Sequence, residues 1–426
     1  MRGLRHERWC GLALLIAITL SARGQDAKTS FSVQSWLEGP DRRDFPWEVR
    51  IDPPTLTYQQ RFLLEVTAAV DGSVLRQKPY RHFTIIVKLA DKDGHWLPGD
   101  DETDYAVTQP TGPIDQLRFY TGVYVRPGDY RIAVLMYDSA HQEGNVKHVT
   151  LHVPAPKHDP LPELARDFPA VEFPARIPGM SDAPIHDPGW SLGQGVEHLP
   201  IANSRPLRID LVLDVSEVDA VPWADGSVRR GAIAEAQYQG NLTTTLAAGS
   251  VLSHLQPARG CVHVSALDMT RTQILLDRRD PASVDWAKLQ LDLANAHHEQ
   301  IDVDTLERQG QRSAFAAKFL TEVATGPGGC AGGPESADRV VILLSHPLLY
   351  PKHTLVTPVT TEQCPGCRFV YLRVTQFRVE YADPYKEMLN PLHPRMVHFL
   401  TPLEFRSVLS RLIVELKEQQ ARAFAH

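Results

Sequence analysis

Polar side chains that could bind a ligand follow two strand-like runs in the second half of the chain. Asp214 and Ser216 come directly after one apolar run, and Ser345 and His346 end another. In open parallel sheets, ligands gather at the carboxyl ends of the strands, so these four residues form the predicted contact surface. A simpler interpretation is that Asp214 caps the loop that follows it and that His346 only fills the end of its strand.

The cysteines favour structural disulfides. Apart from Cys10, which lies in a predicted leader segment, the chain has Cys261, Cys330, Cys364 and Cys367. An even number in an exported protein favours two disulfides, each of which would stabilise the fold by roughly 2 to 4 kcal/mol. Three pairings are possible and the sequence does not choose among them. The first hypothesis pairs Cys261 with Cys330 and Cys364 with Cys367.

Cys364 and Cys367 also have the two-residue spacing of redox-active pairs. In such sites a helix that follows the first cysteine activates its sulfur, whereas here the strand-like run 368–374 follows. Zinc held by four thiolates needs two close pairs, and the sequence has one. Thiol-disulfide chemistry is therefore kept as the alternative function.

No complete catalytic motif occurs in the sequence. A nucleophile elbow, a phosphate-binding glycine loop and a nicotinamide fingerprint are all missing from it. His297, His298 and Glu299 lack the four-residue spacing with which two histidines on one helix share a zinc ion. The sequence predicts that the protein is not an enzyme.

Composition and charge indicate a folded, acidic, exported protein. The 426 residues are 43% hydrophobic and 22% charged, which excludes disordered and fibrous classes, and the net charge of -7 argues against a nucleic-acid partner. Arginines followed by the apolar run Cys10 to Leu20 and by small residues predict a signal peptide over residues 1–24. Its removal takes away four Arg and one Glu and leaves a net charge of -10. No run of the remaining chain is long enough to span a bilayer, so a secreted or periplasmic protein is expected.

The first half of the mature chain has the pattern of an antiparallel β-sandwich. After an N-terminal extension over residues 25–47, residues 48–154 contain short alternating runs such as Phe83–Val87, separated by turn signals at Asp71-Gly72 and Asp93-Gly94. Six or seven strands in this length predict an immunoglobulin-like domain. Residues 155–206 are predicted to be a linker, because 11 of the 33 prolines fall between Pro154 and Pro206.

The pattern changes again after Pro206. Apolar strand-like runs alternate with helical stripes over residues 207–420, before a tail over residues 421–426. The last helix begins at a capping box formed by Thr401 and Glu404. This alternation predicts an α/β fold class, with a mainly parallel Rossmann-like sheet that has helices on both faces.

The order of these elements resembles the von Willebrand factor type A domain, and the closing segment 395–405 resembles its last strand and helix. With the export signal and the sandwich, the chain is similar to the exported Acidobacterial VWFA-related domain proteins. The resemblance implies a magnesium site that begins with Asp-x-Ser-x-Ser. Asp214 and Ser216 match the first two positions and would be the metal ligands, but Val218 does not match the third.

The resemblance also implies a Thr and a second Asp from later loops. The loop Asp277–Ser283 has no Thr, and Ser345 and His346 stand where the second Asp is expected, although Glu217 or Asp219 could substitute for a ligand. Magnesium prefers six oxygen ligands, so a degenerate, metal-free site is expected, with magnesium as the alternative.

Together these observations predict an exported, non-enzymatic adhesion or assembly module that needs no cofactor. Its expected partner is another protein or an envelope or surface polymer. The alternative is an exported thiol-disulfide oxidoreductase that uses Cys364 and Cys367.

Overall fold

The computed structural model describes residues 35–78, 80–108, 115–157, 159–161, 169–175, 190–193, 198–216, 242–297, 309–326, 338–346, 356–360, 367–374 and 383–422. The chain divides into two compact units. The first, here called the sandwich unit, comprises residues up to 53, 64–122 and 127–154. The second, here called the C-terminal unit, comprises residues 54–63, 123–126 and 155–426.

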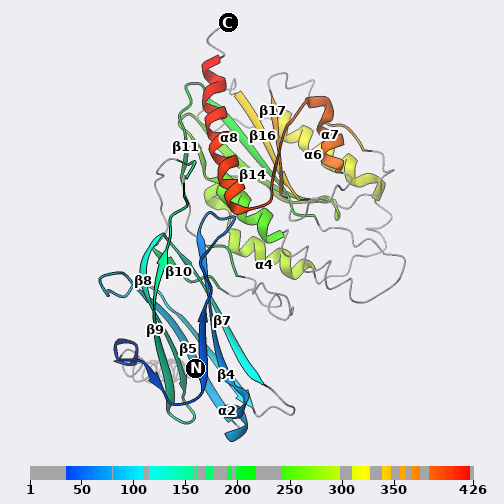
Figure 1. Ribbon diagram of the computed structural model, residues 1–426. Coiled ribbons are helices and arrows are strands. Elements are labelled where there is room, and N and C mark those ends of the chain that lie inside the picture. The colour runs from blue at the N-terminus through cyan, green and yellow to red at the C-terminus, as the bar shows by residue number, and fades with distance from the viewer. Residues whose placement is uncertain are drawn as a thin grey trace, which may run out of the picture. The chain divides into compact units, whose positions relative to one another are not determined.

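The sandwich unit consists of two antiparallel sheets. One has the order β1-β9-β8-β5-β6, and the other contains the neighbours β7, β4 and β2 (Figure 1). The strands are β1 (Arg42–Arg43), β2 (Trp47–Ile51), β4 (Phe62–Asp71), β5 (Tyr80–Ala90), β6 (Asp101–Thr108), β7 (Gln116–Val125), β8 (Gly128–Asp138) and β9 (Glu143–Val153). Phe83 of β5 and Phe119 of β7 meet between the sheets, with their ring centroids 6.0 Å apart. Alternating apolar side chains thus form a core between two sheets, as the sequence pattern requires.

Local structure differs from the sequence prediction at two places in this unit. Asp71-Gly72, predicted as a turn, begins the helix α2 (Gly72–Gln77), because the Asp71 carboxylate accepts a hydrogen bond from the backbone N–H of Ser73 and caps the helix. The edge strand β6 was not predicted. Asp93-Gly94 is a turn as expected, with Gly94 at a φ of 85°.

Part of the predicted proline-rich linker forms strands. β10 (Val171–Glu172) pairs with the end of β7, and β11 (Leu199–Ile201) pairs with β13 (Leu255–Pro257). Residues 54–63, inside the range predicted as sandwich, belong to the C-terminal unit and include β3 (Thr55–Leu56). The Tyr58 hydroxyl there donates a hydrogen bond to the carbonyl of Leu400 at 2.6 Å.

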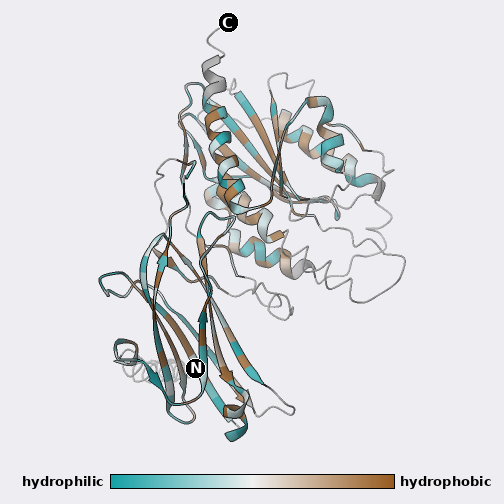
Figure 2. Cartoon of the chain, viewed as in Figure 1, coloured by the Kyte–Doolittle hydropathy of each residue, from teal (hydrophilic) through white to brown (hydrophobic). Residues whose placement is uncertain are grey.

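The C-terminal unit contains a six-stranded sheet with the order β15-β14-β12-β16-β17-β18. Its strands are β12 (Leu207–Asp214), β14 (Gly260–Asp268), β15 (Gln273–Arg279), β16 (Asp338–Ser345), β17 (Arg368–Val374) and β18 (Arg395–Phe399). All neighbours pair in parallel except β14 and β15, which form the predicted hairpin. β12 is buried along its whole length, and Figure 2 shows hydrophobic residues running along the strands of this sheet.

Helices cover both faces of this sheet (Figure 1). One core cluster joins the sheet to the helical residues 242–253, to α4 (Trp286–His297) and to α8 (Pro402–Arg422). The cluster on the opposite face includes α6 (Gln309–Thr325) and α7 (Pro384–Leu389). The C-terminal unit also contains two short 3-10 helices, η1 (Pro281–Ser283) and η2 (Asn390–Leu392).

The predicted N-cap role of Thr401 at the start of α8 is confirmed, whereas Glu404 bonds one residue earlier than a capping box requires. The Thr401 hydroxyl accepts a hydrogen bond from the backbone N–H of Glu404 at 3.1 Å. The Glu404 carboxylate accepts one from the backbone N–H of Leu400 at 2.6 Å. The first bond satisfies a donor that the helix end leaves without an intrahelical partner, and the second fixes the backbone one residue before the N-cap.

The predicted fold class is wrong. Strands make up 45% and helices 27% of the described structure, and several of its sheets are antiparallel, so the chain has a β-rich fold and not a Rossmann-like fold of the von Willebrand factor type A kind. The prediction took the fold class from the strand-helix alternation of the second half. The two sheets of the sandwich, and strands that carried no clear sequence signal, raise the strand content of the whole chain above what that half alone predicts. Among the described residues, no helix is long and apolar enough to cross a membrane.

Candidate functional site

Three of the four predicted site residues converge where β12 and β16 end. One carboxylate oxygen of Asp214 accepts hydrogen bonds from the backbone N–H of Ser216, at 3.1 Å, and from its hydroxyl. The other oxygen accepts a hydrogen bond from the Ser345 hydroxyl at 3.0 Å. The bond to the Ser216 backbone is also an Asx turn, so Asp214 caps the loop that follows it, as the simpler interpretation proposed.

The loop after β14 holds the other side of this cluster. The Ser216 hydroxyl accepts a hydrogen bond from the backbone N–H of Met269 at 2.6 Å. The neighbouring Asp268 is buried and forms an ion pair of 3.0 Å with Arg271. Three strand ends, those of β12, β14 and β16, therefore fix the positions of the cluster's oxygen atoms.

Burial controls the charge of this cluster. It raises the pKa of Asp214 to about 6; hydrogen bonds from Ser216 and Ser345 oppose the rise, while the negative charge of Asp268 adds to it. His346 is also buried, and burial lowers its pKa to about 4 against an opposing contribution from the backbone of Ser216. Neither ring nitrogen of His346 has a well-formed hydrogen bond with a described residue.

The four predicted residues do not form an exposed contact surface. Asp214, Ser216 and Ser345 are 0% exposed and His346 is 1% exposed. Residues 217–241 and 347–355, which continue from the two strand ends, lie outside the described residues, and so do Glu217 and Asp219. The structure thus places a buried polar cluster at this edge of the sheet.

The chemistry open to the cluster is limited. Both hydroxyls hydrogen-bond to Asp214, and the Ser345 hydroxyl also lies 2.9 Å from the backbone carbonyl of His346. Neither hydroxyl bonds to the ring of His346, so the described residues of this cluster hold no serine-histidine pair. One carboxylate and two hydroxyls that already bond to one another supply few free lone pairs. Magnesium prefers six oxygen ligands, so the described residues fit a resident magnesium ion poorly.

Sequence reasoning missed the continuation of this polar edge onto β17 and β18. Arg373 of β17 is in register with Ser345 on one side and with His398 of β18 on the other. Four side chains on neighbouring strands thus form a row, here called the polar row: Asp214, Ser345, Arg373 and His398. The available signal was Arg373 itself, a charged residue on the same face of β17 as the apolar core residues Phe369 and Tyr371.

Asp383, the N-cap of α7, completes this region. Its carboxylate accepts hydrogen bonds from the Tyr371 hydroxyl at 3.1 and 3.2 Å and from the backbone N–H of Lys386 at 3.1 Å. Nη1 of Arg373 lies 3.5 Å from the same carboxylate. Burial and the charge of Asp383 raise the pKa of Tyr371 well above its usual value, which keeps its hydroxyl a donor.

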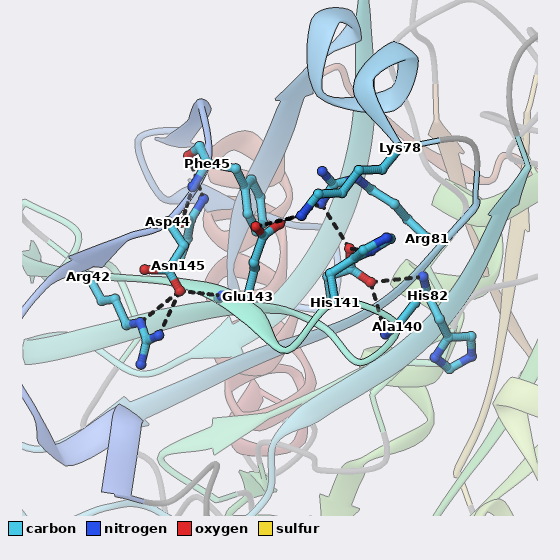
Figure 3. Close-up of polar contacts among 12 residues, drawn as sticks. Arg42, Asp44, Phe45, Lys78, Arg81, His82, Ala140, His141, Glu143 and Asn145 are labelled. Carbon is cyan, nitrogen blue, oxygen red and sulfur yellow. Dashed lines mark hydrogen bonds and ion pairs between the residues drawn. The ribbon is translucent and has the colours of Figure 1, made fainter.

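A second buried polar centre lies in the sandwich unit and serves the fold (Figure 3). Arg81, 2% exposed, forms ion pairs with Asp138 at 2.8 Å and Glu143 at 3.2 Å. Asp138 also accepts hydrogen bonds from the backbone of His82 and Ala140, and the ring of His141 lies 2.8 Å from it. These bonds close the turn between β8 and β9, so the network holds the hairpin in place.

Asp91, Asp93 and His95 lie close enough together to hold a metal ion. They sit at the turn after β5, where one oxygen of Asp91 accepts hydrogen bonds from the backbone N–H groups of Asp93 and His95 at 2.9 Å each. This bonding is that of an ordinary Asx-type turn and explains the cluster without a metal.

Cys261 and Cys367 are both disulfide-bonded. Cys261 is in register with Arg208 of β12, and Cys367 precedes Arg368, which pairs with Val340 of β16. Because β12 and β16 lie between them, they are three strand spacings apart, about 14 Å. A disulfide spans at most about 7 Å between Cα atoms, so these two cysteines do not bond to each other.

Cys330 and Cys364 lie outside the described residues. The first hypothesis, which pairs Cys261 with Cys330 and Cys364 with Cys367, therefore stays a prediction. Cys367 leads directly into a strand, so no helix begins there to stabilise a thiolate, as the alternative redox function would require.

Reduction of these bridges should destabilise the C-terminal unit by roughly 2 to 4 kcal/mol per bridge, because the unfolded chain regains conformational freedom. Denaturant unfolding with and without reductant measures this, and peptide mapping of the unreduced protein identifies the pairing. Identical unfolding midpoints under both conditions would contradict a stabilising role for the bridges.

No family model matches the chain, and no curated protein matches it. Several solved structures are similar at low identity. The ApaA protein from Bordetella pertussis is 12% identical over 26% of this chain and 96% of its own, with a TM-score of 0.18. The N-terminal domain of TFIIH p34 is 12% identical over 49% of this chain and 98% of its own, with a TM-score of 0.25. A family 123 glycoside hydrolase from Clostridium perfringens is 6% identical over 83% of this chain and 72% of its own, with a TM-score of 0.23. Similarities this weak support no conclusion about fold or function.

Proposed function

We propose that the protein is an exported, non-enzymatic binding module that recognises another protein or an envelope polymer at the carboxyl edge of its parallel strands. The polar row carries this proposal. Asp214, Ser345 and Arg373 stand side by side at the carboxyl ends of their strands, and the residues directly before them, Leu213, Leu344 and Leu372, are apolar. Burying such groups costs free energy, and at the carboxyl edge of parallel strands that cost is typical of a ligand site.

In this proposal the buried cluster positions the loops and does not react. Asp214 ties the first turn after β12 to the end of β16 through its two oxygens. The Ser216 hydroxyl adds a tie to the loop after β14. The contact surface in this proposal is the edge of the sheet that these bonds hold together, and no resident metal or cofactor is included.

Replacement of Asp214 with alanine should reduce capture of the partner at least ten-fold, because this edge of the sheet loses the bonds that hold it together. The full mature chain, immobilised, would be incubated with envelope and secreted fractions of its host, and captured molecules would then be purified and titrated directly. Asp292→Ala, which removes an exposed carboxylate paired with Lys288, is the matched control and should capture the partner as the wild type does.

Two results would overturn the proposal: a wild-type chain that captures nothing, or capture by folded Asp214→Ala that equals the control. Circular dichroism of each variant establishes that it is folded. Addition of EDTA should leave capture unchanged, because the proposal includes no metal.

A further inference from the structure

The guanidinium group of Arg373 is buried with one edge unpaired. The residue is 9% exposed, and its Nε and Nη2 atoms have no hydrogen-bond acceptor among the described residues. Within the described part of the chain, Nη1 alone forms an ion pair, with the Asp383 carboxylate at 3.5 Å. Buried polar groups in folded proteins nearly always have partners, so an unpaired buried donor edge requires an explanation.

Asp383 does not supply the missing acceptor. Its oxygens already accept hydrogen bonds from the Tyr371 hydroxyl and from the backbone of Lys386. These bonds hold the carboxylate on the Nη1 side of the guanidinium. The Nε and Nη2 donors are parallel and form the fork that matches two oxygens of one ligand.

The surroundings of Arg373 contain further hydrogen-bond donors. His398 is exposed and pairs in register with Arg373, and Lys386 in α7 is also exposed. Burial lowers the pKa of His398, and the charges of Arg373 and Lys386 lower it further, while the charge of Asp383 opposes them. His398 therefore favours its neutral form, whose ring N–H can donate a hydrogen bond, and Lys386 adds a positive charge.

We propose that Arg373, with Lys386 and His398, forms an oxyanion-binding site in which the Nε–Nη2 edge of Arg373 donates two hydrogen bonds to a carboxylate or phosphate group. Such a site would specify the chemical class of the ligand, which the proposed function leaves open. It depends on Arg373 and not on capture of a macromolecule, so either proposal can fail while the other stands.

The test is calorimetric titration of the full mature chain with sodium phosphate and, separately, with sodium succinate, at constant ionic strength set with chloride. We expect saturable binding of at least one of them, and the stronger one identifies the group. Arg373→Lys keeps the charge but loses the fork, and should weaken binding at least ten-fold. Arg368→Lys, at the other end of the same strand, is the matched control and should change affinity less than two-fold.

Lys386→Ala and His398→Ala keep the test decisive if Arg373→Lys does not fold. Both residues are exposed, so these variants should fold and should each weaken binding several-fold. The proposal is overturned if neither oxyanion binds saturably. It is equally overturned if Arg373→Lys binds as tightly as Arg368→Lys, or if both alanine variants bind like the wild type.

Discussion

Replacement of Asp138 with asparagine should lower the free energy of unfolding of the sandwich unit by about 3 to 5 kcal/mol. The amide keeps the shape of the carboxylate and can still accept from the backbone of His82 and Ala140. It cannot neutralise Arg81, which is 2% exposed and would keep only the partly exposed Glu143, at 3.2 Å, as a counter-ion. The expected loss comes from the charge of Arg81 more than from any lost hydrogen bond.

Lys78→Ala is the matched control. Lys78 pairs with Glu143 in the same network at 2.7 Å, but both side chains are about one-third exposed. Ion pairs that water reaches contribute about 0 to 1 kcal/mol, so this variant should unfold close to the wild type. Denaturant unfolding followed by far-ultraviolet circular dichroism would measure both variants, and equal midpoints for the two would contradict the role given to burial.

A double replacement separates the charge from the network's geometry. Arg81→Met with Asp138→Leu removes both buried charges together, and well-packed apolar pairs are often as stable as the ion pair they replace. The double variant should therefore be more stable than Asp138→Asn alone. If it is less stable, then the hydrogen bonds that close the β8–β9 turn contribute more than the ion pair does.

Local sequence signals sufficed for much of the fold. Period-two alternation located β4, β5, β8 and β9, because an inward side chain every second residue is the requirement of a sandwich core. The N-cap signal at Thr401 located the start of α8, since the hydrogen bonds there lie within four residues. Such features depend on near neighbours in the chain and are visible without a structure.

Features set by distant partners were not visible. β6 is an edge strand that pairs only with β5, and its sequence contains acidic residues that face away from the core. The predicted convergence of Asp214 with Ser345 followed from the geometry of parallel strands. Arg373 was missed because its neighbour Asp383 comes from the cap of a separate helix.

The predicted fold class was wrong for a related reason. The sequence argument weighed the regular alternation of strands and helices after Pro206 more heavily than the short antiparallel strands before it. Strands as short as β1, β3 and β10 are fixed by pairing with longer neighbours and have almost no pattern of their own. A class assigned from the more regular half of a chain therefore underestimates its β content.

Asp214→Asn and His346→Gln should give the chain pH dependences of opposite sign between pH 4 and 6.5. The folded-state pKa of Asp214 is raised from 3.8 to about 6. Its neutral form is therefore favoured by folding, and the stability it contributes is full below pH 3.8 and is lost as the pH rises through 6. Each pKa unit corresponds to about 1.4 kcal/mol, which makes the loss about 3 kcal/mol.

His346 acts in the opposite direction. Its folded-state pKa is lowered from 6.5 to about 4, so folding favours the neutral ring. The stability it contributes is present above pH 6.5 and is lost as the pH falls through 4, again by about 3 kcal/mol. In the wild type the two contributions oppose each other over the same pH interval. The free energy of unfolding should therefore depend only weakly on pH through this pair of residues.

Each variant removes one of the two opposing contributions. Asp214→Asn leaves His346, so relative to the wild type its free energy of unfolding should fall as the pH is lowered from 6.5 to 4. His346→Gln leaves Asp214, so its free energy of unfolding should fall relative to the wild type as the pH is raised from 4 to 6. Denaturant unfolding in EDTA at half-unit pH steps would measure both curves. Slopes of the same sign for the two variants would show that these buried groups do not carry the opposed titrations that their burial predicts.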